Sequence, residues 1–149
     1  MANELLASLD DINAHLPSDK AAIEDADDDL LQVEVYRLVR AKLSSAFATT
    51  TMNTWVDPAS TPEVIRTIAG LVIAAKWYAL LYAEDSTDDA RYANWLYAQA
   101  MDLINGILAG NTAVIDPGGE VINDTGSFGD ADFFPNDDSP AFTMSKEFA

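Results

Sequence analysis

Apolar residues in the range Thr61–Ala83 occupy nearly every side of a helix, instead of the single stripe of an ordinary surface helix. Pro62 at the first helical position and Glu63 in the first turn, after an N-cap threonine, mark where this helix begins. A helix that is apolar almost all round is usually covered on several sides. Arg66 and Lys76 interrupt it, so neither interval reaches the roughly 18 uncharged residues that a membrane span needs. The pattern predicts a central helix covered by other helices and by a neighbouring subunit, with no membrane partner.

Amphipathic patterns on both sides of the central helix predict further helices. A turn of acidic residues joins the central helix to the next one, so the two are expected to form an antiparallel hairpin. The expected pairs across it are Tyr78 with Trp95 and Leu81 with Tyr92. The predicted fold is all-α: a small helical bundle with a long central helix and an antiparallel helical hairpin, plus an extended C-terminal arm. The predicted boundaries are a short helix at 8–16, a helix at 27–47, a connecting arm at 48–60, the central helix at 61–84 and a helix at 87–109, forming one domain over 1–110, and the C-terminal arm at 111–149.

Two features are candidate subunit contacts. Trp55 lies in the connecting arm, whose threonines favour extended backbone, and is either tucked under the domain or an anchor for a neighbouring subunit. Three of the chain's eight basic residues, Arg37, Arg40 and Lys42, gather on the helix at 27–47. This cluster either receives an acidic neighbour or forms a solvated face with local ion pairs to Glu34, which contribute little to stability.

The composition changes after Gly110. The range 111–149 has four of the seven glycines, three of the six prolines and five of the six phenylalanines, and it loses the helical period. We expect an arm that has no core of its own, is disordered until assembly, and then lies on a partner surface; the alternative is a disordered solubilising tail. The residues expected to pair with a partner's exposed strand edge are Val114, Ile115, Val121 and Ile122, and those expected to fill apolar pockets are Phe128, Phe133, Phe134, Phe142 and Phe148.

The charge of the chain excludes some classes of partner. Eight basic and 25 acidic residues give a net charge of −17, which argues against a general nucleic-acid binder and against adhesion to anionic membranes. A strongly acidic surface suits a basic partner or a wall that DNA passes without sticking. The candidates for lining such a channel are Asp19, Glu24, Asp25, Asp27, Asp28 and Asp29 in one segment, and Glu84, Asp85, Asp88 and Asp89 in another.

No catalytic or metal-binding pattern stands out. The chain has no cysteine and a single histidine, His15, and it lacks the glycine-rich phosphate-binding motifs. In the range Asp25–Asp29, carboxylates stand at positions one, three and five of a possible calcium loop. Leu30 and Tyr36 stand where such a loop needs glycine at position six and glutamate at position twelve. We interpret this range as an acidic helix N-terminus. We expect no enzymatic activity, no cofactor and no metal.

The order of the elements resembles a known family. A short helix (SLDDINAHL), an acidic segment, a long helix and a loop with tryptophan and proline precede the central helix (TPEVIRTIAGLVIAAKWYALLY); a turn and the helix ARYANWLYAQAMDLINGILAGNTAVID follow. This layout, over Leu9–Asp116, resembles the head–tail connector, or adaptor, proteins of tailed bacteriophages. The resemblance is one of layout and residue class.

The resemblance implies a virion structural protein. In that family about twelve helical protomers form a closed ring beneath the portal protein. The ring extends the DNA channel, through which DNA passes without specific binding, and offers a platform for the next neck (stopper) or tail protein. The expected location is the head–tail neck of the virion, and the host cytoplasm during assembly.

Two other functions stay open. One is a tail-assembly or decorating protein of the same virion. The other is an acidic regulator that mimics DNA and binds a basic partner, as a monomer or dimer with carboxylates in a phosphate-like double row.

Overall fold

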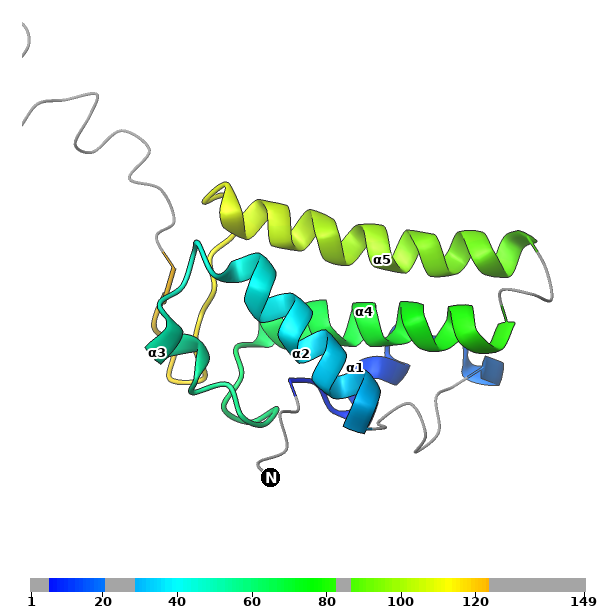
Figure 1. The fold of residues 1–149 in the computed structure, drawn as a ribbon, viewed down its shortest axis with the longest axis horizontal. Coiled ribbons are helices and arrows are strands. Elements are labelled where there is room, and N and C mark those ends of the chain that lie inside the picture. Colours follow the sequence, from blue (N-terminus) through cyan, green and yellow to red (C-terminus); the bar gives the residue numbers. More distant parts are fainter. Residues whose placement is uncertain (1–5, 21–28, 83–86, 124–149) are drawn as a thin grey trace, which may run out of the picture.

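The structure, a computed structural model, describes residues 6–20, 29–82 and 87–123, and these fold as an all-α bundle with a long helical hairpin (Figure 1). The predicted fold class is therefore confirmed. The predicted bounds of the two long hairpin helices are close to those observed, whereas the helix at 27–47 is shorter at its C-terminal end. The elements are α1 (Leu9–Asn13), the 3₁₀ turn η1 (Ser18–Lys20), α2 (Asp29–Leu43), α3 (Thr49–Met52), α4 (Glu63–Tyr82) and α5 (Thr87–Leu108).

Helix α4 is the centre of the bundle. Helix α5 lies antiparallel along it, α2 crosses one side, and α1 packs on another (Figure 1). By length and composition alone α4 could cross a membrane, but most of that stretch is buried inside the bundle. The covering is incomplete at the C-terminal end of α4, where Leu80 is 74% exposed and Leu81 is 48% exposed. The larger side chains that α4 buries are Ile65, Ile68, Leu71, Val72, Ile73, Trp77 and Tyr78.

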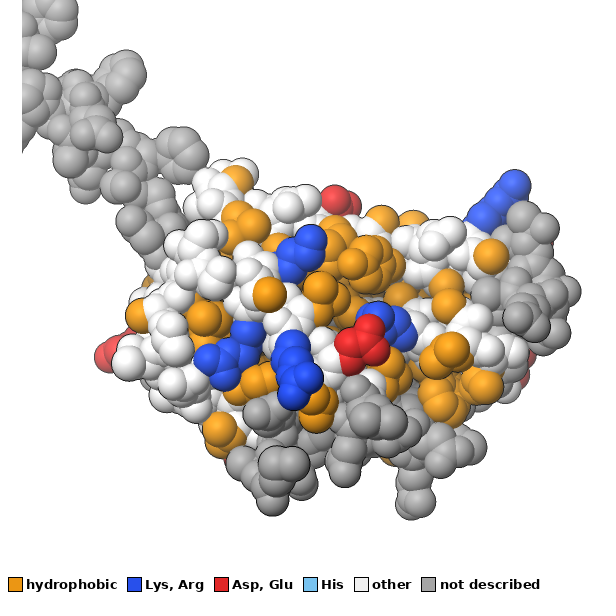
Figure 2. All heavy atoms as spheres, viewed as in Figure 1, with side chains coloured by type: hydrophobic (Ala, Val, Ile, Leu, Met, Phe, Trp, Pro, Cys, Tyr) orange, Lys and Arg blue, Asp and Glu red, His pale blue; other side chains and the backbone are white. Residues whose placement is uncertain are grey.

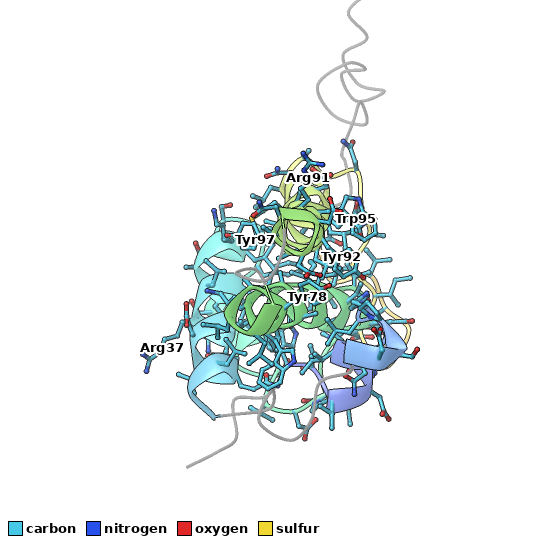
Figure 3. All side chains as sticks on the ribbon, turned by 90° about the vertical axis from the view of Figure 1, so that its right-hand side faces the viewer. Arg37, Tyr78, Arg91, Tyr92, Trp95 and Tyr97 are labelled. Carbon is cyan, nitrogen blue, oxygen red and sulfur yellow. The ribbon has the colours of Figure 1, made fainter. Side chains whose placement is uncertain are left out.

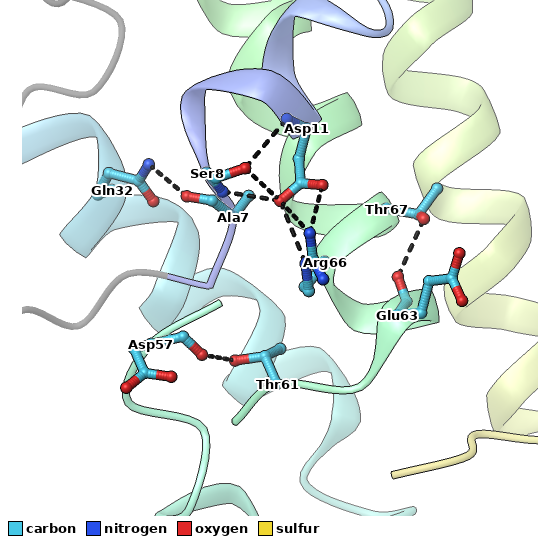
Figure 4. A network of polar contacts seen from close by, with 9 residues as sticks. All are labelled: Ala7, Ser8, Asp11, Gln32, Asp57, Thr61, Glu63, Arg66 and Thr67. Atoms are coloured by element: carbon cyan, nitrogen blue, oxygen red, sulfur yellow. Dashed lines mark hydrogen bonds and ion pairs between the residues drawn. The ribbon is translucent and has the colours of Figure 1, made fainter. Parts of the chain in front are cut away.

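Helix α1 is only five residues long, yet it is held tightly on α4. A capping box closes its N-terminus: the Asp11 amide donates to the Ser8 hydroxyl (3.2 Å), and the Ser8 amide donates to the Asp11 carboxylate (2.8 Å). The same carboxylate accepts a forked ion pair from Arg66 of α4, with Nη2 2.8 Å from Oδ1 and Nε 3.2 Å from Oδ2 (Figure 4). Gly70 permits the close approach, because a Cβ there would lie 2.9 Å from the Asp11 carbonyl oxygen.

The connection from α2 to α4 differs from the prediction. The expected extended arm at 48–60 contains a helical turn, α3, and folds onto the core. Trp55 is 1% exposed and packs edge to face on Phe47, with ring centroids 5.2 Å apart. Met52 is also buried. Burial of these three side chains outweighs the extended preference of the threonines, because that preference is weak and depends on context.

The chain beyond α5 also departs from the expectation. Gly110 ends the helix with a φ of 77°, and the range 111–123 returns to the domain as a small loop. Its two sides pair with each other: Ile115 and Val121 form an antiparallel bridge, and the Ile122 amide donates to the Val114 carbonyl (2.9 Å). Val114 is fully buried. The predicted arm therefore begins later than residue 111, and the expected disorder is wrong for this range.

We expect Gly70→Ala to lower the free energy of unfolding by about 1–3 kcal/mol, because the new methyl group presses on the backbone of α1. Gly106→Ala is the matched control. Its Cβ would meet the Thr112 hydroxyl at 2.6 Å, a side-chain atom that can rotate away, so the gain in helix propensity of up to about 1 kcal/mol is retained in part. Urea denaturation of both variants measures the difference. Equal losses in the two variants would contradict the proposed contact between α1 and α4.

We expect the free energy of unfolding to fall in two steps as the pH is lowered. Burial lowers the pKa of His15 from 6.5, although the Asp11 charge opposes this, so the folded state favours the neutral ring and loses stability as pH falls below about 6.5. Burial raises the pKa of Asp11, but the hydrogen bonds from Arg66 and Ser8 outweigh it and hold the value below 3.8, so stability is lost again near and below that pH. Melting temperatures from about pH 8 to about pH 3 measure both steps.

The two steps are separable by substitution. His15→Gln removes the upper step and leaves the lower one, whereas Asp11→Asn keeps the upper step and weakens the lower one, to which Asp57 also contributes because hydrogen bonds from Ser60 lower its pKa. An upper step that persists in His15→Gln would assign it to another group.

Candidate protein-interaction surfaces

From Tyr92 onward, the outer face of α5 carries almost no charge. Between Tyr92 and Leu108 the only charged residue is Asp102, in a chain whose net charge is −17. Interface cores are depleted in charge and enriched in aromatic residues, so this composition is typical of a contact surface. We call this surface the α5 strip; its exposed uncharged residues are Asn94, Trp95, Tyr97, Ala98, Asn105 and Leu108.

An aromatic ladder holds Trp95 in place on the α5 strip. Buried Tyr78 of α4 packs edge to face on Tyr92 (centroids 5.1 Å), and Tyr92 stacks on Trp95 (5.7 Å), whose side chain is 54% exposed (Figure 3). The Tyr92 hydroxyl donates to the His15 carbonyl (2.6 Å), and the Tyr78 hydroxyl donates to the Asp89 carboxylate. A tryptophan fixed in this way loses little side-chain entropy on binding, which favours it as an interface anchor.

The ladder corrects the predicted hairpin register. Tyr78 contacts Tyr92 instead of Trp95, a shift of about one helical turn. The expected aromatic zone exists, but Tyr92 turns inward toward α1, where its hydroxyl binds the His15 carbonyl. The pairing of Leu81 with Tyr92 is replaced by the pairing of Tyr78 with Tyr92.

The second surface is basic and lies on α2. Residues 35–56 contain no acidic residue but include Arg37, Arg40 and Lys42. Glu34 was expected to pair with this cluster, but its carboxylate pairs with the Lys76 ammonium group of α4 instead (2.6 Å). These five residues form what we call the α2 basic face, in which four basic side chains and one carboxylate give a formal charge of +3; Figure 2 shows Lys and Arg side chains gathered on this side of the molecule.

Arg40 is fixed within the α2 basic face. Its guanidinium donates to the Tyr36 hydroxyl and to the Asn53 side-chain oxygen, both at 2.6 Å, and lies 5.1 Å from the centre of the Tyr36 ring. Arg40 thus joins α2 to the end of α3 and is oriented before any partner binds. Arg37 projects away from the bundle (Figure 3) and, like Lys42, is exposed.

Trp95 of the α5 strip and Arg37 of the α2 basic face lie on opposite flanks. In the view along the hairpin, Arg37 points outward on the α2 side, whereas Tyr92 and Trp95 lie on the side of α1 (Figure 3). Trp95 thus faces away from the α2 basic face, whereas Tyr97, which belongs to the same strip, lies on the α2 side (Figure 3). A protomer with two different, opposed surfaces has the geometry that head-to-tail association requires.

Several predicted site residues have other roles in the structure. Trp55 is a core residue, so the interpretation as an exposed anchor is wrong. Val114, Ile115, Val121 and Ile122 pair with one another within the chain, and their predicted pairing with a partner stays a prediction. Asp19 and Asp88 are exposed, and Asp89 is bonded to Tyr78. The predicted residues that lie outside the described ones are Glu24, Asp25, Asp27, Asp28, Glu84, Asp85, Phe128, Phe133, Phe134, Phe142 and Phe148, and the side chain of Asp29 is not described either.

The structure brings together residues that sequence patterns did not connect. Asp11 and Arg66 are 55 positions apart and form one ion pair, and the buried Gln32 side chain donates to the Ala7 carbonyl (3.2 Å) (Figure 4). Nothing in their local spacing indicates these contacts. Among the described residues, no three His, Asp or Glu side chains converge to hold a metal ion.

We expect Tyr92→Phe to lower the free energy of unfolding by about 1 kcal/mol, because the His15 carbonyl loses its donor. Trp95 loses its fixed neighbour at the same time, so its indole N–H resonance should broaden or shift. Tyr97→Phe, on the other side of α5, is the control and should leave both measurements unchanged. Identical spectra for Tyr92→Phe and the unmodified protein would show that the ladder does not orient Trp95.

Comparison with protein-family models, with curated proteins and with solved structures finds no match for this chain.

Proposed function

We propose that this chain is a virion structural protein, a head–tail connector that forms a ring of about twelve copies beneath the portal protein. The ring joins the DNA-filled head to the tail and extends the DNA channel toward the next neck or tail protein. No catalysis and no cofactor belong to this role. The layout of helices that resembles the connector family supports the proposal.

The observation that carries the proposal is the pair of opposed flanks. A closed ring needs a heterologous contact, in which one surface of each subunit meets a different surface of the next. The α5 strip and the α2 basic face are two such surfaces. We assign the subunit contact to them: the α5 strip of one copy, anchored by Trp95, packs on the α2 side of the next.

Electrostatic repulsion favours the same assignment. Copies with a net charge of −17 repel one another, so contact is least costly where a surface is neutral or positive. Among the described residues, the α5 strip and the α2 basic face meet that condition best. The acidic residues then remain on the other surfaces, including the channel wall, where DNA slides without adhering.

The alternative of an acidic DNA mimic gains less support. Such a protein presents carboxylates in regular rows, whereas the outer face of α5, the longest helix among the described residues, carries Asp102 as its one charge between Tyr92 and Leu108. Gene order distinguishes a connector from a tail-assembly or decorating protein of the same virion. Portal and major capsid genes directly upstream favour the connector.

We expect Trp95→Ser and Arg37→Glu each to abolish ring formation, because each disables one side of the heterologous contact. Mixing the two variants leaves one intact pair of surfaces, so the mixture should form a one-to-one dimer that cannot grow. Light scattering coupled to size-exclusion chromatography measures the masses. Arg91→Glu reverses an exposed charge at the edge of the α5 strip, one helical turn before Trp95, and leaves Trp95 in place; it is the control and should leave ring formation unchanged.

A symmetric dimer in the unmodified protein would overturn the head-to-tail arrangement. So would rings of normal size from either single variant.

A further inference from the structure

The α2 basic face has apolar side chains interleaved with its charges. Exposed Ala41 and half-buried Leu38 lie one helical turn from Arg37 and Lys42 respectively, so apolar and cationic side chains alternate along the helix. Because Glu34 is paired with Lys76, the charge at this surface stays positive. An occupant of matching chemistry carries carboxylates interleaved with apolar side chains.

The chain itself supplies such a segment. Residues 124–149 contain six acidic residues, one lysine and five phenylalanines. Their centre reads Asp130-Ala-Asp132-Phe133-Phe134-Pro-Asn-Asp137-Asp138, with two phenylalanines between two pairs of carboxylates. The spacing places acidic groups on both sides of an apolar pair, which matches a basic surface with an apolar strip.

The described chain ends beside α3. The Asn123 side chain accepts from the Val114 amide (2.7 Å) and donates to the Thr112 carbonyl (2.8 Å), which fixes the point where the segment leaves the domain. The neighbouring Ile122 lines a cavity of about 440 Å³ together with Thr50, Thr54 and Trp55, at the end of the molecule where α3 lies (Figure 1).

The link from α3 to the basic face is direct. Asn53, at the end of α3, accepts the hydrogen bond from Arg40. The segment therefore starts beside α3, and α3 is joined to the α2 basic face by Arg40.

The length of the segment suffices for a contact within one molecule. Asp130 lies seven positions after Asn123, and this stretch spans up to about 23 Å when extended. Helix α2 has 15 residues and is about 22 Å long. Tethering over such a short linker gives an effective concentration in the millimolar range, so weak charge pairs are enough to populate the contact.

We propose that, in the free subunit, residues 124–149 bind in cis to the α2 basic face of their own chain. The carboxylates of Asp130, Asp132, Asp137 and Asp138 meet Arg37 and Lys42, and Phe133 and Phe134 pack along Leu38 and Ala41. The contact itself does not depend on ring formation. Its consequence rests on the proposed function: the segment covers the flank that the next subunit needs, and it must leave before the ring closes.

The test places a single spin label on the full chain. The chain has no cysteine, so Ser139→Cys carries the only nitroxide. We expect paramagnetic relaxation enhancement of the backbone amides in the second half of α2, around Arg37 to Leu43. The enhancement should fall in about 1 M NaCl, where the Debye length is about 3 Å.

Charge variants identify the surface. Arg37→Glu combined with Lys42→Glu should lower the ratio of bound to free segment by about threefold or more, because two exposed ion pairs are lost and replaced by repulsion. Arg91→Glu on α5 is the matched control and should leave the enhancement unchanged. Asparagine at the four aspartates should reproduce the effect of the double α2 variant.

Mixing separates contact within a molecule from contact between molecules. In the cis arrangement, an isotope-labelled protein without the spin label shows no enhancement when mixed with an unlabelled spin-labelled protein. The cis proposal would be overturned if the enhancement in that mixture equalled the enhancement in a chain that carries both the isotope label and the spin label. Enhancement centred on α5, or an equal loss in Arg91→Glu, would overturn it as well. All of these measurements are made in the Trp95→Ser background, which lacks one side of the ring contact and keeps the α2 basic face, so their failure leaves the ring proposal standing, and the failure of ring formation leaves this contact standing.

Discussion

The apolar surface of α4 on nearly all sides is the constraint on which the rest of the structure depends. At roughly 25 cal/mol for each Å² removed from water, burying such a helix is the main favourable contribution that a chain of 149 residues can make to its folding. Helix α5 covers one side, α2 crosses a second, and α1 occupies a third with the help of Gly70. The short elements extend this cover: α3 brings Met52 and Trp55 into the core, and the return of the chain after Gly110 brings in Val114.

This covering determines what the surface can offer a partner. Helix α5 uses its inner side for α4 and presents its outer side almost without charge, with Trp95 held by Tyr92 and Tyr78. Helix α2 uses its apolar side for α4 and α5 and presents a cationic side. The hydrophobic core thus lies between Trp95 and the cationic side of α2. The proposed ring and the proposed cis contact of residues 124–149 both use the α2 flank, so they are mutually exclusive, and acidic repulsion restricts contact elsewhere.

Much of the fold could be predicted because its signals are local. The starts and ends of α4 and α5 follow from proline, acidic first-turn residues and Gly110, and the central place of α4 follows from its apolar pattern.

The failures involve contacts between distant residues. Threonine propensity favoured extended backbone where burial of Trp55 imposed a helical turn. The glycine and proline content after Gly110 concealed the pairing of Ile115 with Val121, which depends on a docking site for Val114 that no local pattern reveals. Among the candidate contacts, the basic cluster on α2 could be predicted because basic residues are scarce in this chain. The orientation of Trp95 could not, because it depends on contacts of Tyr92 with Tyr78 and with the His15 carbonyl.

The mass of the assembled particle is the direct test of the head-to-tail contact between subunits. Native mass spectrometry of the full chain, across a concentration series and with asparagine in place of Asp130, Asp132, Asp137 and Asp138 as a second sample, separates closed rings from other assemblies. The proposed head-to-tail contact predicts one closed species of about twelve copies, which appears at lower concentration in the asparagine variant. Monomers or two-fold dimers in both samples at every concentration would contradict it.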